Sequence, residues 1–177
     1  LNKNYALVIT TNAGLWRYKI GDTLKFTSLS PYRIQITGRI KNHINVFGEE
    51  LMIENAEVAL SKAAREMNLN IVDYTAGPIF METNVKGGHQ WLIEFTHPPK
   101  DKGRFVELLD HYLKTENSDY EAKRYKDITL SLPKLEIAKK NLFYNWMAKK
   151  NKLGGQHKVP RLSNKRDFIE ELLIMNH

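Results

Sequence analysis

Short runs of alternating apolar and polar residues fill the beginning of the chain. Alternation with a period of two is typical of a strand that buries one face, and RIQITG at residues 33–38 is the clearest case. Gly21 and Asp22 interrupt the pattern with residue types that favour a tight hairpin turn. The pattern therefore predicts three or four short antiparallel strands, which cover Tyr5–Thr11, Leu15–Ile20, Thr23–Leu29 and Arg33–Gly38.

The spacing of the apolar residues becomes helical from Glu50 to Met67, and from there predicted helices and strands alternate. Paired glycines and paired prolines separate several of these segments, because such residues end regular structure. After the helix at Glu50–Met67, the predicted elements are strands at Ile71–Thr75 and Pro78–Thr83 (or one bent strand), a strand at Gln90–Thr96, a helix around Phe105–Leu113, a short helix capped at Ser118-Asp119, a strand at Ile128–Leu132, a helical segment at Lys139–Lys150 and a last helix at Lys165–Ile174.

The order of these elements predicts an α+β fold. From about Asn42 it runs strand, helix, strand, strand, helix, strand, which is the split βαβ (ferredoxin-like) arrangement of a mixed sheet with helices on one face. The β-rich lead-in before it is a separate unit. We therefore expect one part at residues 1–41 and a compact α+β domain at residues 42–177. Because Leu1 is followed almost at once by a strand-like run, we expect the chain to be a piece of a longer polypeptide.

The net charge of +7 is unevenly distributed along the 177 residues. Between Lys134 and Arg166 ten Lys or Arg residues face a single acid, so this stretch carries +9 and the remainder −2. Such a basic segment fits either a polyanionic partner or an ordinary solvated surface. The chain has no cysteine, which excludes disulfides, thiolate metal sites and a cysteine nucleophile, and it favours a cytoplasmic protein. No apolar run is long enough for a transmembrane helix.

Several common catalytic motifs are absent. The six histidines show no pair at the i,i+4 spacing of a helical metal motif, so no metal site is predicted. There is no G-x-S-x-G nucleophile motif, and neither a P-loop nor a G-x-G-x-x-G sequence occurs. The chain therefore has no phosphate-binding loop of a standard type.

Three short segments carry the remaining candidate chemistry. In the first, Tyr18–Asp22, an aspartate at a strand end could accept hydrogen bonds from a ribose diol, or serve a turn only. In the second, Gly38-Arg39 combines a bend with a cation, although a strand with a basic connector is the better explanation of this segment taken alone. In the third, Lys158 follows Gly154-Gly155 and precedes Pro160, so it lies on a loop that could carry a cation to a phosphate, or on a plain surface loop.

Together, the three segments resemble the adenylate-forming superfamily of acyl-CoA ligases, adenylation domains and luciferases. Tyr18–Asp22 is similar to its Y-[RK]-x-G-D motif, and Gly38-Arg39 to the Gly-Arg at the hinge between its domains. The sequence QHKVPR at residues 156–161 resembles the Q-[YF]-K-x-P-R segment of the auxin-responsive Gretchen Hagen acyl-acid amido synthetases. His157 departs from that pattern, because an aromatic residue is usual there. Residues 48–51 (GEEL) resemble bacterial members of the family.

The resemblance implies the C-terminal part of an ATP-dependent acyl-acid amido synthetase, which adenylates a carboxylic acid and then joins it to an amine or amino acid. It implies that Lys158 is catalytic in adenylate formation and that Asp22 binds the ribose. Tyr18 and Arg39 would support the nucleotide, and Lys41 would lie at the hinge. Mg²⁺ would be bound mainly through the N-terminal domain, which also supplies the phosphate loop and the acyl pocket. The fragment alone is therefore expected to be inactive.

Two alternatives stay open at the level of sequence. An acyl-CoA ligase of the same superfamily would share the adenylation step and transfer the acyl group to a thiol. A basic nucleic-acid-binding α+β module would use the positive stretch, but no segment resembles the aromatic consensus that stacks RNA bases. We therefore expect neither a nucleic-acid nor a membrane partner.

Overall fold

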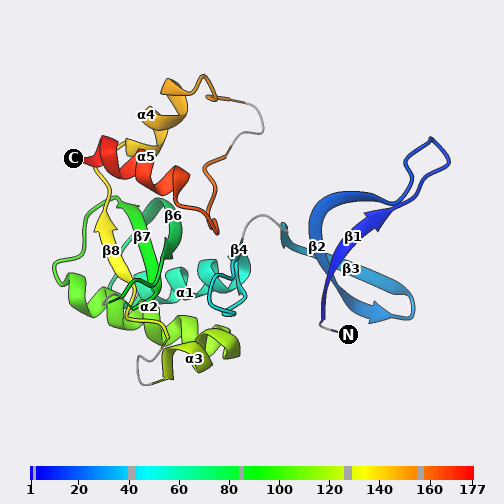
Figure 1. The fold of residues 1–177 in the computed structure, drawn as a ribbon, viewed down its shortest axis with the longest axis horizontal. Coiled ribbons are helices and arrows are strands. Elements are labelled where there is room, and N and C mark those ends of the chain that lie inside the picture. The colour runs from blue at the N-terminus through cyan, green and yellow to red at the C-terminus, as the bar shows by residue number, and fades with distance from the viewer. Residues whose placement is uncertain (2, 40–42, 84–85, 126–128, 155–157) are drawn as a thin grey trace.

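The computed structural model describes residues 1–177 apart from residues 2, 40–42, 84–85, 126–128 and 155–157. It confirms the α+β class: an antiparallel three-stranded sheet at the N-terminus lies beside a second sheet that helices flank (Figure 1). An ion pair links the two parts, because Lys25 Nζ lies 3.5 Å from Glu54 Oε1.

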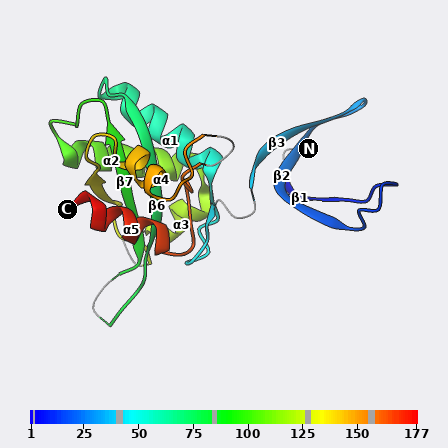
Figure 2. The same cartoon turned by 90° about the horizontal axis from the view of Figure 1, so that it is seen from above.

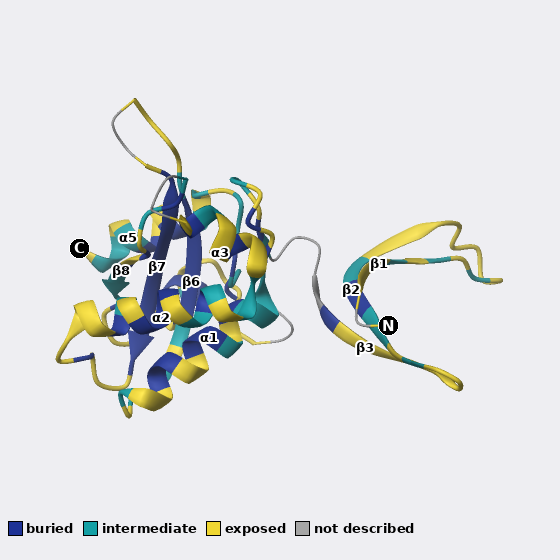
Figure 3. Ribbon diagram, turned by 90° about the horizontal axis from the view of Figure 1, so that it is seen from below, coloured by how far each residue is buried: buried dark blue, intermediate teal, exposed yellow. Residues whose placement is uncertain are grey.

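The N-terminal sheet is a simple meander in the order β1-β2-β3. Its strands are β1 (Asn4–Ile9), β2 (Tyr18–Leu29) and β3 (Tyr32–Arg39). The predicted hairpin turn at Gly21-Asp22 is wrong, because β2 continues through these residues. Many of the sheet's apolar side chains are exposed, and Figure 3 shows it mostly in the colour of exposed residues.

A two-stranded ladder opens the second part of the chain. β4 (His43–Ile44) pairs with β5 (Leu51–Met52), and α1 (Ile53–Glu66) follows directly. The buried side of α1 consists of four alanines and Leu60. Small side chains let the helix approach its neighbours closely, and α1 packs along α2 (Lys102–Glu116).

The central sheet has the order β6-β7-β8. β6 (Ile71–Ile79) is antiparallel to β7 (Gly88–Phe95), and β8 (Lys134–Ile137) is parallel to β7. A parallel pair requires a crossover connection, which α2 and α3 (Ser118–Arg124) supply. Every residue of β7 is buried, as expected for a strand that is covered on both faces.

Helices cover both faces of this sheet, in contrast to the prediction of one. One core lies between the sheet, α1 and α2, and includes Trp91 and Ile93 of β7. Leu92 points to the opposite face and packs in a second core with α4 (Leu142–Lys149) and α5 (Asp167–Asn176). Figure 2 shows α4 and α5 on the side of the sheet away from α1 and α2. Successive side chains of β7 therefore point into two different cores.

Two further details differ from the split βαβ prediction. β7 and β8 are adjacent, so no strand of the described chain lies between them as the ferredoxin-like order requires, and β4 pairs with β5. The predicted strand at 128–132 begins outside the described residues, at Ile128. In its described part Leu130 makes only an isolated bridge to Gly87, so the strand was predicted too early in the chain. The strand forms instead at Lys134–Ile137, where it continues along β7.

Candidate functional site

Asp22 lies at an irregularity in β2. The pairs Ala6–Thr23 and Val8–Lys19 flank it, so three residues of β2 lie opposite one residue of β1. Gly21 has a φ of +89°, a conformation that glycine adopts without strain and that bulges commonly use. The glycine that sequence reasoning assigned to a turn thus forms a bulge, which places the half-buried Asp22 next to the end of β3.

The structure brings two of the predicted nucleotide-binding residues together through the backbone. Asp22 pairs with Arg39, the last residue of β3. Tyr18 begins β2 on the far side of the bulge, and its side chain is 53% exposed. The side chain of Arg39 is not described, and Lys41 lies outside the described residues.

Lys158 belongs to a different region of the chain. It is exposed, whereas Val159 beside it is buried in the second core. The following residues run along the free edge of β6, where the Thr75 hydroxyl donates to the Pro160 carbonyl at 2.7 Å and the Ala76 amide to the Arg161 carbonyl at 2.9 Å. Residues 155–157 of the predicted loop lie outside the described residues.

The Arg161 side chain fixes the same segment a second time. Its guanidinium forms an ion pair with Asp73 and lies 4.6 Å from the centre of the Tyr74 ring. Burial, together with the nearby Glu57 carboxylate, raises the pKa of the Tyr74 hydroxyl well above its usual range, so the ring beneath the cation stays neutral. Lys158 therefore lies three residues from a firmly anchored arginine.

Two cavities meet at this anchor. One, of about 570 Å³, lies between α1 and the beginning of β6. The other, of about 430 Å³, lies between β6, β7 and α4, and Lys158 is part of its lining. Val72, Asp73 and Arg161 line both cavities. The Arg161–Asp73 pair therefore forms part of the wall between them.

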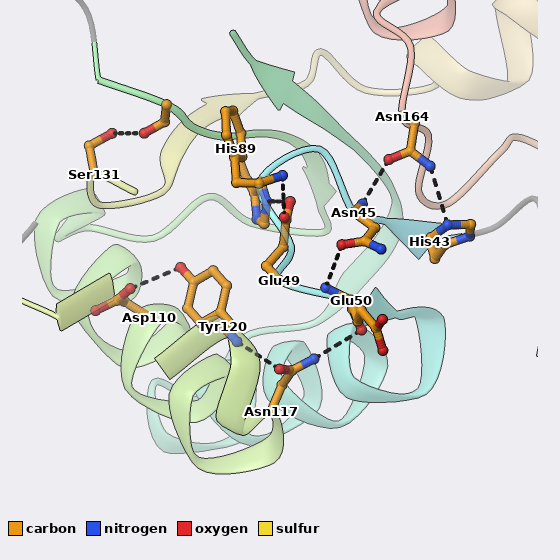
Figure 4. A network of polar contacts seen from close by, with 12 residues as sticks. His43, Asn45, Glu49, Glu50, His89, Asp110, Asn117, Tyr120, Ser131 and Asn164 are labelled. Atoms are coloured by element: carbon orange, nitrogen blue, oxygen red, sulfur yellow. Dashed lines mark hydrogen bonds and ion pairs between the residues drawn. The ribbon is translucent and has the colours of Figure 1, made fainter. Parts of the chain in front are cut away.

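The sequence did not reveal a buried hydrogen-bond contact between Glu49 and His89. Both side chains are fully buried, and His89 Nε2 lies 2.9 Å from Glu49 Oε1 (Figure 4). Burial alone would raise the pKa of Glu49, but the His89 contact and a hydrogen bond from the Phe47 amide hold that pKa below its ordinary value. The one signal in the sequence was a histidine next to the run of residues that was predicted as a strand.

This contact fixes the loop between β4 and β5 to β7. Figure 4 shows that the loop is also held from outside the sheet, because the Asn164 side chain accepts a hydrogen bond from the Asn45 amide at 2.7 Å. The Asn117 side chain donates to the Glu50 carbonyl at 3.1 Å. The loop directly follows β4, so these contacts anchor the start of the second part of the chain.

The described residues offer neither a metal site nor a membrane-spanning helix. No three His, Cys, Asp or Glu side chains in this part of the chain gather into a group that could hold a metal ion. Within the same residues, no helix combines the length and apolarity needed to cross a membrane.

Comparison with known proteins links the chain to one group of enzymes. It is 28% identical to the Arabidopsis thaliana indole-3-acetic acid-amido synthetase GH3.3 over 97% of its length, and 32% identical to the indole-3-acetic acid-amido synthetase GH3.2 of the same plant over 50%. It spans only 31% and 17% of these relatives. The solved structure of the GH3.15 acyl acid amido synthetase superimposes with a TM-score of 0.74 at 20% identity, over 98% of this chain and 32% of the other.

Family profiles match most of the sequence. The GH3 family central domain matches residues 1–39, and the GH3 family C-terminal domain matches residues 54–167. These ranges leave residues 40–53 unassigned, so the predicted division between residues 41 and 42 stays a prediction. The resemblance to the Gretchen Hagen amido synthetases is confirmed, and the chain belongs to the GH3 family.

Proposed function

We propose that this chain is the C-terminal part of an ATP-dependent acyl-acid amido synthetase, in which residues 42–177 form a small mobile domain. The observation that carries the proposal is the placement of Lys158. Its side chain is exposed at the start of a segment that β6, the second core and Arg161 hold in place. Because this segment is fixed to its own domain, a movement of the whole domain would bring the Lys158 side chain to a partner domain in a defined position.

In the proposed first step, a carboxylate oxygen of the acid attacks the α-phosphorus of ATP and pyrophosphate leaves. Negative charge grows on the phosphoryl oxygens, and the Lys158 ammonium would stabilise it electrostatically. Domain closure would bring the lysine to that position. In the second step an amine attacks the acyl carbonyl carbon, and AMP leaves with the bonding electron pair.

Asp22 would hold the nucleotide in place by accepting hydrogen bonds from the two ribose hydroxyls. The bulge at Gly21 supports this role, because it places the carboxylate at the end of the β2–β3 ladder. Tyr18 and Arg39 would contact the nucleotide from the same sheet. The described residues do not offer a cluster of acids for Mg²⁺, so we assign that ion to residues outside this chain and no step to it.

The alternatives fit the molecule less well. The matched relatives are named amido synthetases, which favours an amine over a thiol as acceptor. A nucleic-acid module would need free cations in the basic stretch, but several of these side chains lie within 4.0 Å of a carboxylate. They are Lys134, Lys150, Arg161 and Arg166.

The proposal is tested with the intact protein that contains this chain. Exchange of labelled pyrophosphate into ATP should depend on added carboxylic acid, and amide should form when an amino acid is also present. Acid-independent exchange, or transfer to coenzyme A in preference to amino acids, would overturn the assignment.

A further inference from the structure

Asn164 lies at the end of the segment that begins with Lys158. The segment, residues 158–164, follows the free edge of β6, and we call it the Lys158 segment. The half-buried side chain of Asn164 reaches from there to β4 and the loop behind it. β4 begins at His43, shortly after the proposed hinge at Gly38-Arg39. One side chain therefore joins the Lys158 segment to the hinge side of the domain.

Asn164 uses both ends of its amide group in this contact. The Asn45 backbone amide lies 2.7 Å from Asn164 Oδ1, and His43 Nε2 lies 3.4 Å from Asn164 Nδ2 (Figure 4). A backbone N–H can only donate, so the oxygen of the side chain must face Asn45. The NH₂ group is then left to donate to His43. An apolar side chain of similar size at this position would lose both contacts.

The rest of the Lys158 segment is fixed to the sheet. Val159 and Leu162 are both buried, one in each core. Leu162 also forms a parallel bridge with Ala76 of β6, and the Ser163 amide donates a hydrogen bond to the Ala76 carbonyl at 3.2 Å. A segment held along its length in this way moves as one piece.

The loop that Asn164 contacts is fixed as well. The Glu49–His89 contact ties it to β7, and the Asn117 side chain holds the Glu50 carbonyl from the start of α3. Among the hydrogen bonds of the described residues, those that join β4 and its loop to the Lys158 segment both come from Asn164. Asn164 is therefore the polar link between two well-anchored parts.

We propose that Asn164 is a positioning residue that couples the hinge to Lys158. When the domain turns about the hinge, the two Asn164 contacts make the Lys158 segment follow β4 without slack, so the ammonium group reaches the α-phosphoryl group in a defined position. The inference rests on the proposed function, which supplies the domain movement and the role of Lys158. It goes beyond that function, because it gives a residue that contacts no substrate control over the rate of adenylation.

Two variants of Asn164 test this role in the intact protein that contains the chain. Asn164→Leu removes both contacts, and Asn164→Asp keeps an acceptor for the Asn45 amide. Asn164→Leu should lower kcat for acid-dependent pyrophosphate exchange about tenfold or more and change the KM for ATP little, because a slightly displaced catalytic group lowers the rate of the chemical step. Asn164→Asp should stay within about threefold of the unmodified enzyme.

Asn70→Leu is the matched control, since Asn70 is exposed between α1 and β6. Its pyrophosphate exchange should be normal. A normal rate in Asn164→Leu would overturn the proposal, and so would equal losses in Asn164→Leu and Asn164→Asp.

Two comparisons distinguish positioning from general damage to the fold. Amide formation from a supplied acyl-adenylate should stay near normal in Asn164→Leu, because the phosphoryl displacement has already occurred. In a Lys158→Ala background, Asn164→Leu should cause little further loss of pyrophosphate exchange, because it acts through the lysine. An equal fall of both half-reactions, or additive losses in the double variant, would mean a merely structural role and overturn the inference.

Hydrogen–deuterium exchange measures the coupling without an assay of activity. In the intact Asn164→Leu variant, the amides of residues 43–52 and 158–164 should exchange about fivefold faster, as expected for a lost hydrogen bond, while those of α2 stay unchanged. Unchanged deuterium uptake in either segment would overturn the link. An unmodified enzyme without acid-dependent pyrophosphate exchange would refute the proposed function, whereas normal pyrophosphate exchange that is indifferent to Asn164 would refute only the positioning role.

Discussion

The backbones of Asp22 and Arg39 lie opposite each other at the end of the β2–β3 ladder. The next pair, Thr23 and Gly38, continues the ladder, and the Thr37 hydroxyl donates a hydrogen bond to the Thr23 hydroxyl at 3.0 Å in a buried position. Two residues that are seventeen positions apart in the sequence numbering thus become neighbours through strand pairing. This relationship gives the proposed ribose and hinge motifs a common location.

Replacement of Asp22 should weaken nucleotide binding in the intact enzyme. A lost charged hydrogen bond costs about 1.5–3 kcal/mol, so Asp22→Ala should raise the Kd for ATP roughly ten- to a hundredfold by calorimetry. Asp119→Ala, an exposed aspartate on α3, is the matched control and should bind ATP normally. Unchanged ATP affinity in Asp22→Ala would exclude the ribose assignment.

The role of Lys158 can be separated from that of the general basic surface. If Lys158 stabilises charge on the α-phosphoryl group, Lys158→Ala should lower acid-dependent pyrophosphate exchange by about two orders of magnitude or more. Amide formation from a supplied acyl-adenylate should suffer much less, because the phosphoryl displacement has already occurred. Exchange and amide formation are measured separately in the same preparation.

Lys149 is the control for this experiment, since it is exposed in the same basic stretch at the end of α4. A generic polyanion surface would make Lys149→Ala and Lys158→Ala similar and sensitive to salt. Similar losses in the two variants, or an equal fall of both half-reactions in Lys158→Ala, would contradict the proposed role.

Local patterns in the sequence identified most helices and strands but not every connection between them. The helical spacing before Met67 led to α1, and the alternation of RIQITG led to β3. Gly21-Asp22 misled the prediction because a tight turn and a bulge use the same residue types. The helices on the second face were also missed, since a strand covered on both faces gives no alternation from which a face can be assigned.

The contacts that surround the candidate site could not be predicted, because they join distant residues. Glu49 and His89 are 40 positions apart, and Arg161 and Asp73 are 88 apart. Neither pair shows in a periodicity, which extends over one helix or strand only. The motif residues Asp22 and Lys158 could be named by resemblance, whereas the groups that hold their segments in place emerged from the fold.

Arg161 should act as a positioning residue for Lys158. Arg161→Lys keeps one charge but loses the planar contact with Tyr74 and the fixed geometry toward Asp73. We expect kcat for adenylation to fall about tenfold or more, as a small displacement of a catalytic group does, while the KM for ATP changes little. Arg161→Ala should be more severe than Arg161→Lys. A rise in KM with normal kcat would place Arg161 in ground-state binding instead.

The Asp73 partner provides an independent check by a double-mutant cycle. Asp73→Asn and Arg161→Lys should be strongly non-additive in kcat, because each removes the same contact. Additive effects would show that the two side chains act separately and would contradict a common anchor.

The buried Glu49–His89 contact should make the stability of the chain depend on pH in the acid range. The pKa of Glu49 is lowered in the folded state, so its charged form stabilises the protein above the ordinary glutamate pKa of 4.5, and this contribution is lost as the pH falls through the lowered value. One proton taken up on unfolding changes the free energy of unfolding by about 1.4 kcal/mol per pH unit.

Glu49→Gln should therefore be less stable than the unmodified chain at neutral pH, and its stability should fall less steeply below pH 4.5. Urea denaturation at a series of pH values measures both curves, and Glu107→Gln on the surface of α2 should follow the unmodified chain. Parallel curves for Glu49→Gln and the unmodified chain would mean that Glu49 titrates normally and that the loop between β4 and β5 is held to β7 without a charged contact.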